Sequence, residues 1–422
     1  MGLSPSLLSL RNARRDPIAF LERVPADRPV VEFALSRQRA FLVNDPAIVH
    51  DVLVANDVNF RKPPALDRAA RLLGRGLLTA EGRVHALRRK VIQPVFHRDR
   101  MSRYADAIVA QTARHTAPWS DGRTLDVMNE MTTLTLGVIG DVLFSTDLRP
   151  LAPELRRILA DAVDGLDPLV ALVAPARRLG PLRRRLHEIV QDLIDARLTS
   201  GERPDDLLTL LLESSGPEAT LSQLHDDVTT LLLAGHDTIG NALTWTWGWL
   251  GEHPAVEARL HLELDEVLGG RAAGIADVPR LPFTRAVLAE SLRLNPPAWI
   301  IARTALKEHS LGDVIVPAGG LVVISPYLLH RDRRFFANPL VFDPSRWVVS
   351  DAESPSRRAY IPFGAGRRSC IGESFAWLEG VLVLATVAQT WRLSPINGRP
   401  PVDARITLRP RGPVWMRSTA RR

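Results

Sequence analysis

Apolar residues recur at helical spacing along most of the chain from Asp45 onward. This spacing places them on one face of a helix, where they can be buried. Residues 222–251 are apolar on nearly all faces, which predicts a long helix that crosses the core. The segments with a helical pattern are residues 82–93, 99–116, 127–144, 152–165, 182–198, 222–251, 254–268, 283–294 and 374–389.

Short runs of alternating or continuous apolar residues predict a smaller amount of β-structure. Residues 30–35 and 40–43 lie between turn signals and predict an early hairpin. Further extended segments are expected at residues 299–303, 313–316, 320–324, 391–394 and 405–408. The pattern therefore predicts a mainly α fold with small β-sheets. Because the sequence has no linker-like or repeated segment, we expect residues 1–422 to form a single domain.

Composition narrows the class of protein. The formal net charge is +7, but basic and acidic residues are interspersed and no basic tail is present, which argues against nucleic-acid binding. The N-terminus lacks the order of a signal peptide, and no run approaches the roughly 18 apolar residues of a membrane span. We therefore expect a soluble, cytoplasmic monomer without a membrane anchor.

Cys370 is the only cysteine of the chain, so it cannot form an internal disulfide. It precedes the apolar helix predicted at residues 374–389, and a helix N-terminus favours a thiolate. Gly366 allows a sharp turn, Gly372 allows a flat ligand to approach, and Arg368 suits a carboxylate. These features favour a thiolate that binds the iron of a planar, carboxylate-bearing cofactor such as haem. The alternative is an inert, buried cysteine.

The sequence Phe-Gly-Ala-Gly-Arg-Arg-Ser-Cys-Ile-Gly at residues 363–372 resembles the haem-loop signature F-x-x-G-x-R-x-C-x-G of the cytochrome P450 family. The resemblance implies a soluble, bacterial-type haem-thiolate enzyme with a triangular, α-rich fold. Haem b would lie between the long central helix and the helix that follows the cysteine. Cys370 would be the axial iron ligand, and Phe363, Gly364, Arg368 and Gly372 would surround the cofactor.

Ala-Gly-His-Asp-Thr at residues 234–238 lies in the middle of the predicted central helix. Thr238 can bond a carbonyl of the preceding turn, and Asp237 is an acid in an apolar stretch, where carboxylates seldom persist without a partner or a task. A kink in a buried helix is the alternative. The pentad resembles the (A/G)-G-x-(D/E)-T motif of the same family, found here 132 residues before the cysteine.

That second resemblance assigns the catalytic roles. Thr238 would hydrogen-bond iron-bound oxygen, and Asp237 would pass protons inward through water. Ala234 and Gly235 would leave room for the flat cofactor against the helix. We expect His236, at the variable position of the motif, to pack or to contact water.

Glu290 and Arg293 are three residues apart and share a helix face. Most such pairs are solvated surface ion pairs. These two resemble the family's buried E-x-x-R motif, which an arginine from a later loop completes, and Arg346 is the candidate. The three residues would hold the cysteine loop from behind without taking part in the chemistry.

Several cations are candidates for the two haem propionates. His85 and Arg89 share a helix face in an H-x-x-x-R pattern that many soluble family members carry, although a solvated pair is the alternative. Arg303 and Arg368 are the other candidates. In the family, the same side of the haem faces the electron donor. The residues that make this neighbourhood basic are Arg88, Arg89, Lys90, Arg98, Arg100 and Arg103.

No reductase domain is visible after the cysteine loop, so we expect electrons to come from NAD(P)H through separate proteins. An acidic ferredoxin or flavodoxin, with its reductase, would dock on the basic neighbourhood. From the family's topology, the substrate pocket would be lined by the segment after Lys62, residues 165–182 and further side chains. These are Leu233, Ala234, Ala298, Trp299, Ile300 and Ile406. They are mostly apolar and suit a small hydrophobic molecule, a terpenoid first and a polyketide or fatty acid next.

The predicted enzyme is a monooxygenase that uses O2 to hydroxylate or epoxidise this small hydrophobic molecule, which we expect to be a secondary metabolite. Two alternatives remain open. One is a peroxide-driven or non-oxidative member of the same family, which can dispense with the Asp237–Thr238 pair. The other is a haem-binding sensor or carrier. Metallohydrolase, P-loop and Rossmann motifs are absent from the sequence.

Overall fold

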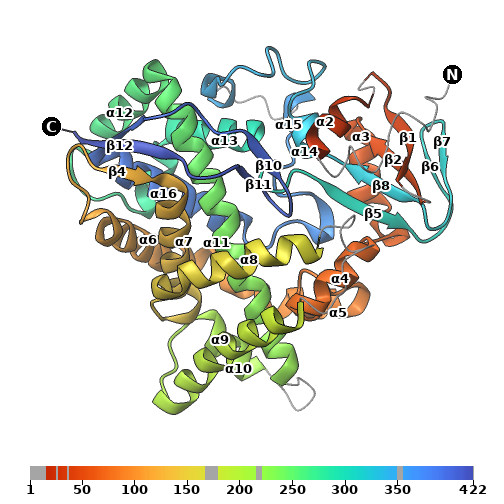
Figure 1. Cartoon of the computed structure of the whole chain (residues 1–422), viewed down its shortest axis with the longest axis horizontal. Helices are drawn as coiled ribbons and strands as arrows, with labels where there is room; N and C mark the ends of the chain where they lie inside the picture. The colour runs from red at the N-terminus through yellow and green to blue at the C-terminus, as the bar shows by residue number, and fades with distance from the viewer. Residues whose placement is uncertain are drawn as a thin grey trace.

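Helix α11 (Leu221–Glu252) runs through the middle of the molecule, and the other long helices pack around it (Figure 1). The computed structural model describes residues 16–24, 27–35, 38–166, 179–214, 221–348 and 355–421. In Figure 1 the outline is roughly triangular, with α9 and α10 at one corner and the largest sheet at another. The expectation of a mainly α fold with small sheets is confirmed.

The longer helices follow the apolar pattern closely. Two of them, α7 (Val127–Phe144) and α12 (Pro254–Leu268), have the expected bounds. The others are α5 (Gly82–Ile92), α6 (Met101–Thr116), α8 (Ala152–Leu166), α9 (Leu179–Ser200), α13 (Pro282–Leu294) and α16 (Glu373–Thr390). The pattern did not predict α4 (Pro64–Leu73), α10 (Leu207–Ser214) or the short helices α2 (Pro17–Glu22), α3 (Pro46–His50), α14 (Pro326–Leu329) and α15 (Pro355–Ala359).

The largest sheet contains five strands in the order β1-β2-β8-β5-β3. The expected hairpin is present, since β1 (Val30–Leu35) pairs antiparallel with β2 (Gln38–Val43). β2 pairs parallel with β8 (Leu321–Ile324), which pairs antiparallel with β5 (Ile301–Ala305), and β3 (Phe60–Arg61) forms the edge. The smaller sheets pair β6 (His309–Leu311) with β7 (Val314–Val316), β10 (Val402–Ala404) with β11 (Leu408–Pro410), and β12 (Trp415–Ala420) with both β4 (Thr124–Asp126) and β9 (Trp391–Pro395).

The expected strand at residues 405–408 is wrong. Strands β10 and β11 flank a tight turn there, in which the N–H of Arg405 donates to the carbonyl of Thr407 at 3.2 Å. This turn is fixed at both ends, because Trp299 Nε1 donates to the Arg405 carbonyl and the Leu408 N–H donates to the Pro297 carbonyl. The turn therefore has a defined place beside α11.

Helices α7 and α11 approach each other unusually closely. A Cβ added to Gly240 of α11 would lie 2.9 Å from Thr132 Cγ2 and 3.0 Å from Thr132 Cα on α7. Thr135 Oγ1 of α7 donates to the His236 carbonyl at 3.0 Å. By length and composition α7 could also cross a bilayer, but 72% of it is buried within the protein, as expected for a core helix. This close contact fixes the position of α11 relative to α7 in the core.

Candidate functional site

The loop between α15 and α16 folds back on itself and presents Cys370. Gly364 and Gly366 have φ angles of +71° and +72°, which favour glycine. A side chain on Gly366 would also collide with the carbonyl oxygen of Leu53, 2.0 Å from an added Cβ. The N–H of Cys370 donates to the Phe363 carbonyl at 2.9 Å and closes the loop. Gly372 then caps α16, three residues before Phe375 enters the core.

The Cys370 side chain is accessible to solvent although protein atoms surround it. Burial raises the pKa of the thiol, while the N–H of Gly372 and the nearby charge of Arg89 act in the opposite direction. The sulfur is therefore desolvated by the surrounding protein and still accessible. This arrangement suits a ligand that packs against the protein and binds the sulfur.

Helix α11, like the cysteine loop, has an accessible residue within a mostly buried segment. Ala234 is exposed, whereas Leu233 before it and His236 after it are buried. Thr238 Oγ1 donates to the Ala234 carbonyl at 3.0 Å, as expected. Helix α16 lies close to this region, since a Cβ on Gly380 would contact Ile239 Cδ1 at 3.4 Å. The exposed Ala234 and the half-buried Thr238 therefore lie near the helix that follows Cys370.

A group of crowded basic side chains lies beside α5. His85 and Arg303 are 8% and 9% exposed, and Lys62 donates to the carbonyls of Leu77 and Ala80. Burial lowers the pKa of Lys62 to about 8, of His85 to about 4 and of Arg303 to about 10. Arg368 lies among them and contributes to all three shifts.

Two carboxylates balance only part of this positive charge. Glu81 accepts from Arg368 Nη2 at 3.0 Å, and Asp57 is held by both nitrogens of an Arg367 fork at 2.6 and 2.8 Å. The cations are thus desolvated and mutually repulsive, which is unfavourable unless an anion joins them. A dianionic group, such as the two propionates of haem, fits this cluster.

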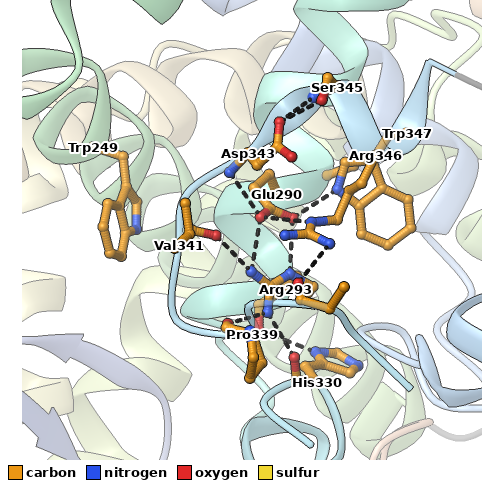
Figure 2. Close-up of polar contacts among 12 residues, drawn as sticks. Trp249, Glu290, Arg293, His330, Pro339, Val341, Asp343, Ser345, Arg346 and Trp347 are labelled. Carbon is orange, nitrogen blue, oxygen red and sulfur yellow. Dashed lines mark hydrogen bonds and ion pairs between the residues drawn. The ribbon is translucent and has the colours of Figure 1, made fainter. Parts of the chain in front are cut away.

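Behind the cysteine loop, Glu290 and Arg293 form a fully buried ion pair at 2.7 Å (Figure 2). All five N–H groups of Arg293 are used: two bind Glu290, and three bind the carbonyls of His330, Pro339 and Val341. Glu290 also accepts from Arg346 Nε at 3.0 Å, from Trp347 Nε1 at 2.8 Å and from the Asp343 N–H at 3.0 Å. The segment from Asp343 to Trp347 is therefore joined to helix α13 at one carboxylate.

His330 and Tyr360 connect this network to the cysteine loop. His330 Nδ1 donates to the Arg293 carbonyl at 3.2 Å, and Nε2 accepts from the Ile361 N–H at 3.0 Å. Tyr360 donates to the Ala289 carbonyl at 3.0 Å and packs on Trp347. Sequence reasoning missed both residues, because neither belongs to a motif. It also missed Lys62, although lysine occurs only at positions 62, 90 and 307 of a chain with 54 basic residues.

Comparisons with known proteins agree with this geometry. The sequence model of the family Cytochrome P450 matches residues 20–415. Cyclooctatin synthase of Streptomyces melanosporofaciens is 39% identical over 94% of this chain and 90% of that protein. Pentalenene oxygenase of Streptomyces avermitilis is 33% identical over 96% of this chain and 94% of that protein. The crystal structure of CYP175A1 from Thermus thermophilus superposes with a TM-score of 0.81, at 29% identity and 99% coverage of both chains.

The chain belongs to the cytochrome P450 family. It is therefore an oxidoreductase with monooxygenase activity, and its chemistry uses haem iron and electrons from a redox partner. The expected P450 fold is confirmed. The accessible sulfur, the exposed Ala234 of α11 and the crowded basic side chains fit a haem in this P450.

In this P450 the missing side chain of Gly235 makes room for a neighbouring helix and not, as expected, for the cofactor. A Cβ at this position would point toward α7 and lie 2.9 Å from Ile139 Cδ1. The absence of a side chain is therefore explained by the close packing of α7 on α11, and Ala234 is the residue exposed beside it. Gly372 meets no comparable constraint, because an added Cβ would contact only Phe96 at 3.7 Å.

The residues expected to line the substrate pocket divide into two groups. Ala298, Ile300 and Ile406 are exposed, the last two by 37% and 49%. Leu233 and Trp299 are instead buried. Leu233 packs in the main core, and Trp299 packs with the largest sheet while its indole donates to Arg405. The segment after Lys62 forms α4, and residues 167–178 lie outside the described residues.

The cations near α5 are less available for docking than the sequence suggests. Arg88 forms a buried ion pair with Asp227, and Arg89 donates to the Ser369 carbonyl at 2.7 Å within the cysteine loop. Arg100 and Arg103 share Asp205. Among the described residues, Lys90 and Arg98 are exposed and form no ion pair.

Replacing Glu290 with Gln should destabilise this P450 by about 3–5 kcal/mol, because it leaves Arg293 buried without its counter-charge. Chemical unfolding at neutral pH measures the effect. Arg39→Gln is the matched control, since it removes an exposed ion pair with Glu32 and should leave the unfolding midpoint unchanged. Equal midpoints for the Glu290→Gln and Arg39→Gln proteins would contradict the account.

Stability should fall in acid because of His330. Burial and Arg293 lower its folded-state pKa to about 3 from 6.5. Unfolding therefore takes up a proton below pH 6.5, and stability is lost as the pH falls from 6.5 toward 3, by up to about 1.4 kcal/mol per pH unit. Urea unfolding of wild type and of His330→Gln on both sides of pH 6.5 measures this contribution.

His330→Gln should be less stable than wild type above pH 6.5 but should lose less stability in acid. His97→Gln, which replaces an exposed histidine, should retain the wild-type pH dependence. The same acid sensitivity in wild type and His330→Gln would show that His330 is not the group responsible.

Proposed function

We propose that this P450 is a haem-thiolate monooxygenase that hydroxylates or epoxidises a small terpenoid. The observation that carries the proposal is the desolvated but accessible Cys370 sulfur in a loop that protein contacts hold in place. The substrate class is supported by similarity to cyclooctatin synthase, cyclooctat-9-en-7-ol 5-monooxygenase and pentalenene oxygenase, which are terpenoid-modifying P450s.

In this proposal Cys370 binds the iron of haem b through its thiolate. Arg303, Arg368 and Lys62 would hold the propionates through charge, because these cations lack sufficient negative charge among themselves, and the ring of His85 would add a hydrogen bond. Arg89 holds the cysteine loop itself, because it donates a hydrogen bond to the Ser369 carbonyl. When bound, haem supplies the redox chemistry that splits O2 and transfers one oxygen atom to the substrate.

Asp237 and Thr238 deliver the protons that the reaction consumes. Each turnover combines substrate, O2, two electrons and two protons, and yields oxygenated product and one water. Asp237 is only partly buried and accepts protons from water, and Thr238 presents a hydroxyl beside the exposed Ala234. The exposed apolar side chains of Ala298, Ile300 and Ile406 would contact the hydrophobic substrate.

Electrons come from NAD(P)H through a ferredoxin or flavodoxin and its reductase. Lys90 and Arg98, on the exposed side of α5 and just after it, would attract an acidic donor. We place this reaction in the cytoplasm and propose that the protein works as a monomer with separate redox partners.

The carbon monoxide difference spectrum of the reduced protein tests the iron ligand. Wild type should give the strongly red-shifted Soret band of a thiolate, and Cys370→Ser should lose it because a hydroxyl does not replace a thiolate. Ser374→Ala, in the first turn of α16, is the control and should retain the band. A red-shifted band in Cys370→Ser, or none in folded wild type supplied with haem, would overturn the proposal.

Reduction by an acidic ferredoxin should slow several-fold as ionic strength rises, because salt screens surface charges over about 10 Å at 0.1 M. Lys90→Glu and Arg98→Glu should slow it at low salt. Arg417→Glu makes the same charge change on β12, at the opposite side of the molecule in Figure 1, and should have little effect. Reduction rates that change neither with ionic strength nor with any of the three substitutions would contradict the proposed docking site.

A further inference from the structure

The Asp237 carboxylate is tied to a distant part of the chain. Its Oδ2 accepts from Thr407 Oγ1 at 2.9 Å and from Asn241 Nδ2 at 3.1 Å. Thr407 lies in the turn between β10 and β11, 170 residues after Asp237, whereas Asn241 is one turn further along α11. Among the described residues no hydrogen bond reaches Asp237 Oδ1. One oxygen is therefore held by two donors, and the other is free to exchange protons.

The donor groups are themselves fixed. Asn241 is fully buried, and its Nδ2 lies 3.4 Å from Thr407 Oγ1 as well. Trp299 and Trp245 donate to the Arg405 and Leu408 carbonyls at 2.9 and 3.3 Å, on either side of Thr407. The Thr407 hydroxyl can donate one hydrogen bond, and it donates this bond to Asp237. The turn cannot move without disturbing this contact.

We propose that Thr407 is a positioning residue for oxygen activation, which with Asn241 holds the Asp237 carboxylate in the orientation needed for proton delivery. This inference rests on the proposed function. A hydrogen bond to a charged group is stronger than one between neutral groups, so the hydroxyl selects one rotamer of Asp237. Ile406, the exposed neighbour of Thr407, places the same turn beside the proposed substrate region.

Thr407→Val removes the hydroxyl and keeps the shape of the side chain, whereas Thr407→Ser keeps the hydroxyl. We expect Thr407→Val to lower kcat about tenfold, the effect of losing one hydrogen bond to a charged group. More of the consumed electrons should then appear as hydrogen peroxide. KM and the carbon monoxide spectrum should stay unchanged, and Thr407→Ser should restore kcat. Unchanged kcat in Thr407→Val, or an equal loss in Thr407→Ser, would overturn the proposal.

A double-mutant cycle tests whether Thr407 acts through Asp237. In the Asp237→Asn background, Thr407→Val should cause no further loss of kcat, because the carboxylate is already absent. A further tenfold loss would mean that Thr407 acts elsewhere and would overturn the proposal.

Infrared spectroscopy gives a readout that does not depend on activity. The carboxylate band assigned to Asp237 by Asp237→Asn should shift in Thr407→Val and return in Thr407→Ser. If the band does not shift, the inference fails while the proposed function stands. If wild type forms no thiolate-ligated haem, the proposed function fails, whatever the infrared result.

Discussion

The buried ion pair between Glu290 and Arg293 is the interaction on which the candidate site depends. An isolated buried charge is very unfavourable, so both side chains must be saturated with partners. Those partners come from residues 330–347, and His330 passes the connection on to the Ile361 N–H at the start of the cysteine loop. Helix α13 thus determines where the loop begins, and the two glycines of the loop determine where the sulfur points.

The side chains next to this loop fit a planar dianionic cofactor. Desolvation lowers the pKa values of Lys62, His85 and Arg303, Ala234 is exposed in the middle of a core helix, and the Cys370 thiol is accessible. A planar dianionic cofactor satisfies all three features at once, since its ring covers apolar surface and its acids balance the cations.

The sequence predicts well those features that are local or periodic. Helices α7 and α12 follow the apolar spacing to the residue. Arg346 completes the Glu290–Arg293 pair, as the resemblance to the E-x-x-R motif implies. Long-range contacts carry no such pattern. Strand β12 was missed because it is stabilised by pairing with β4 and β9, and Thr407 meets Asp237 only through the tertiary fold. Gly235 was misread because sequence cannot tell which neighbour a missing side chain faces.

The central claim is that contacts behind the loop, and not the cofactor alone, keep the Cys370 thiolate in place. The most direct measurement is the absorption spectrum of the reduced, carbon monoxide-bound Glu290→Gln protein beside that of Arg39→Gln. The account predicts that Arg39→Gln keeps the red-shifted thiolate band and that Glu290→Gln loses most of it, because the loop is released from His330 and Tyr360. A full and lasting thiolate band in Glu290→Gln would contradict the account.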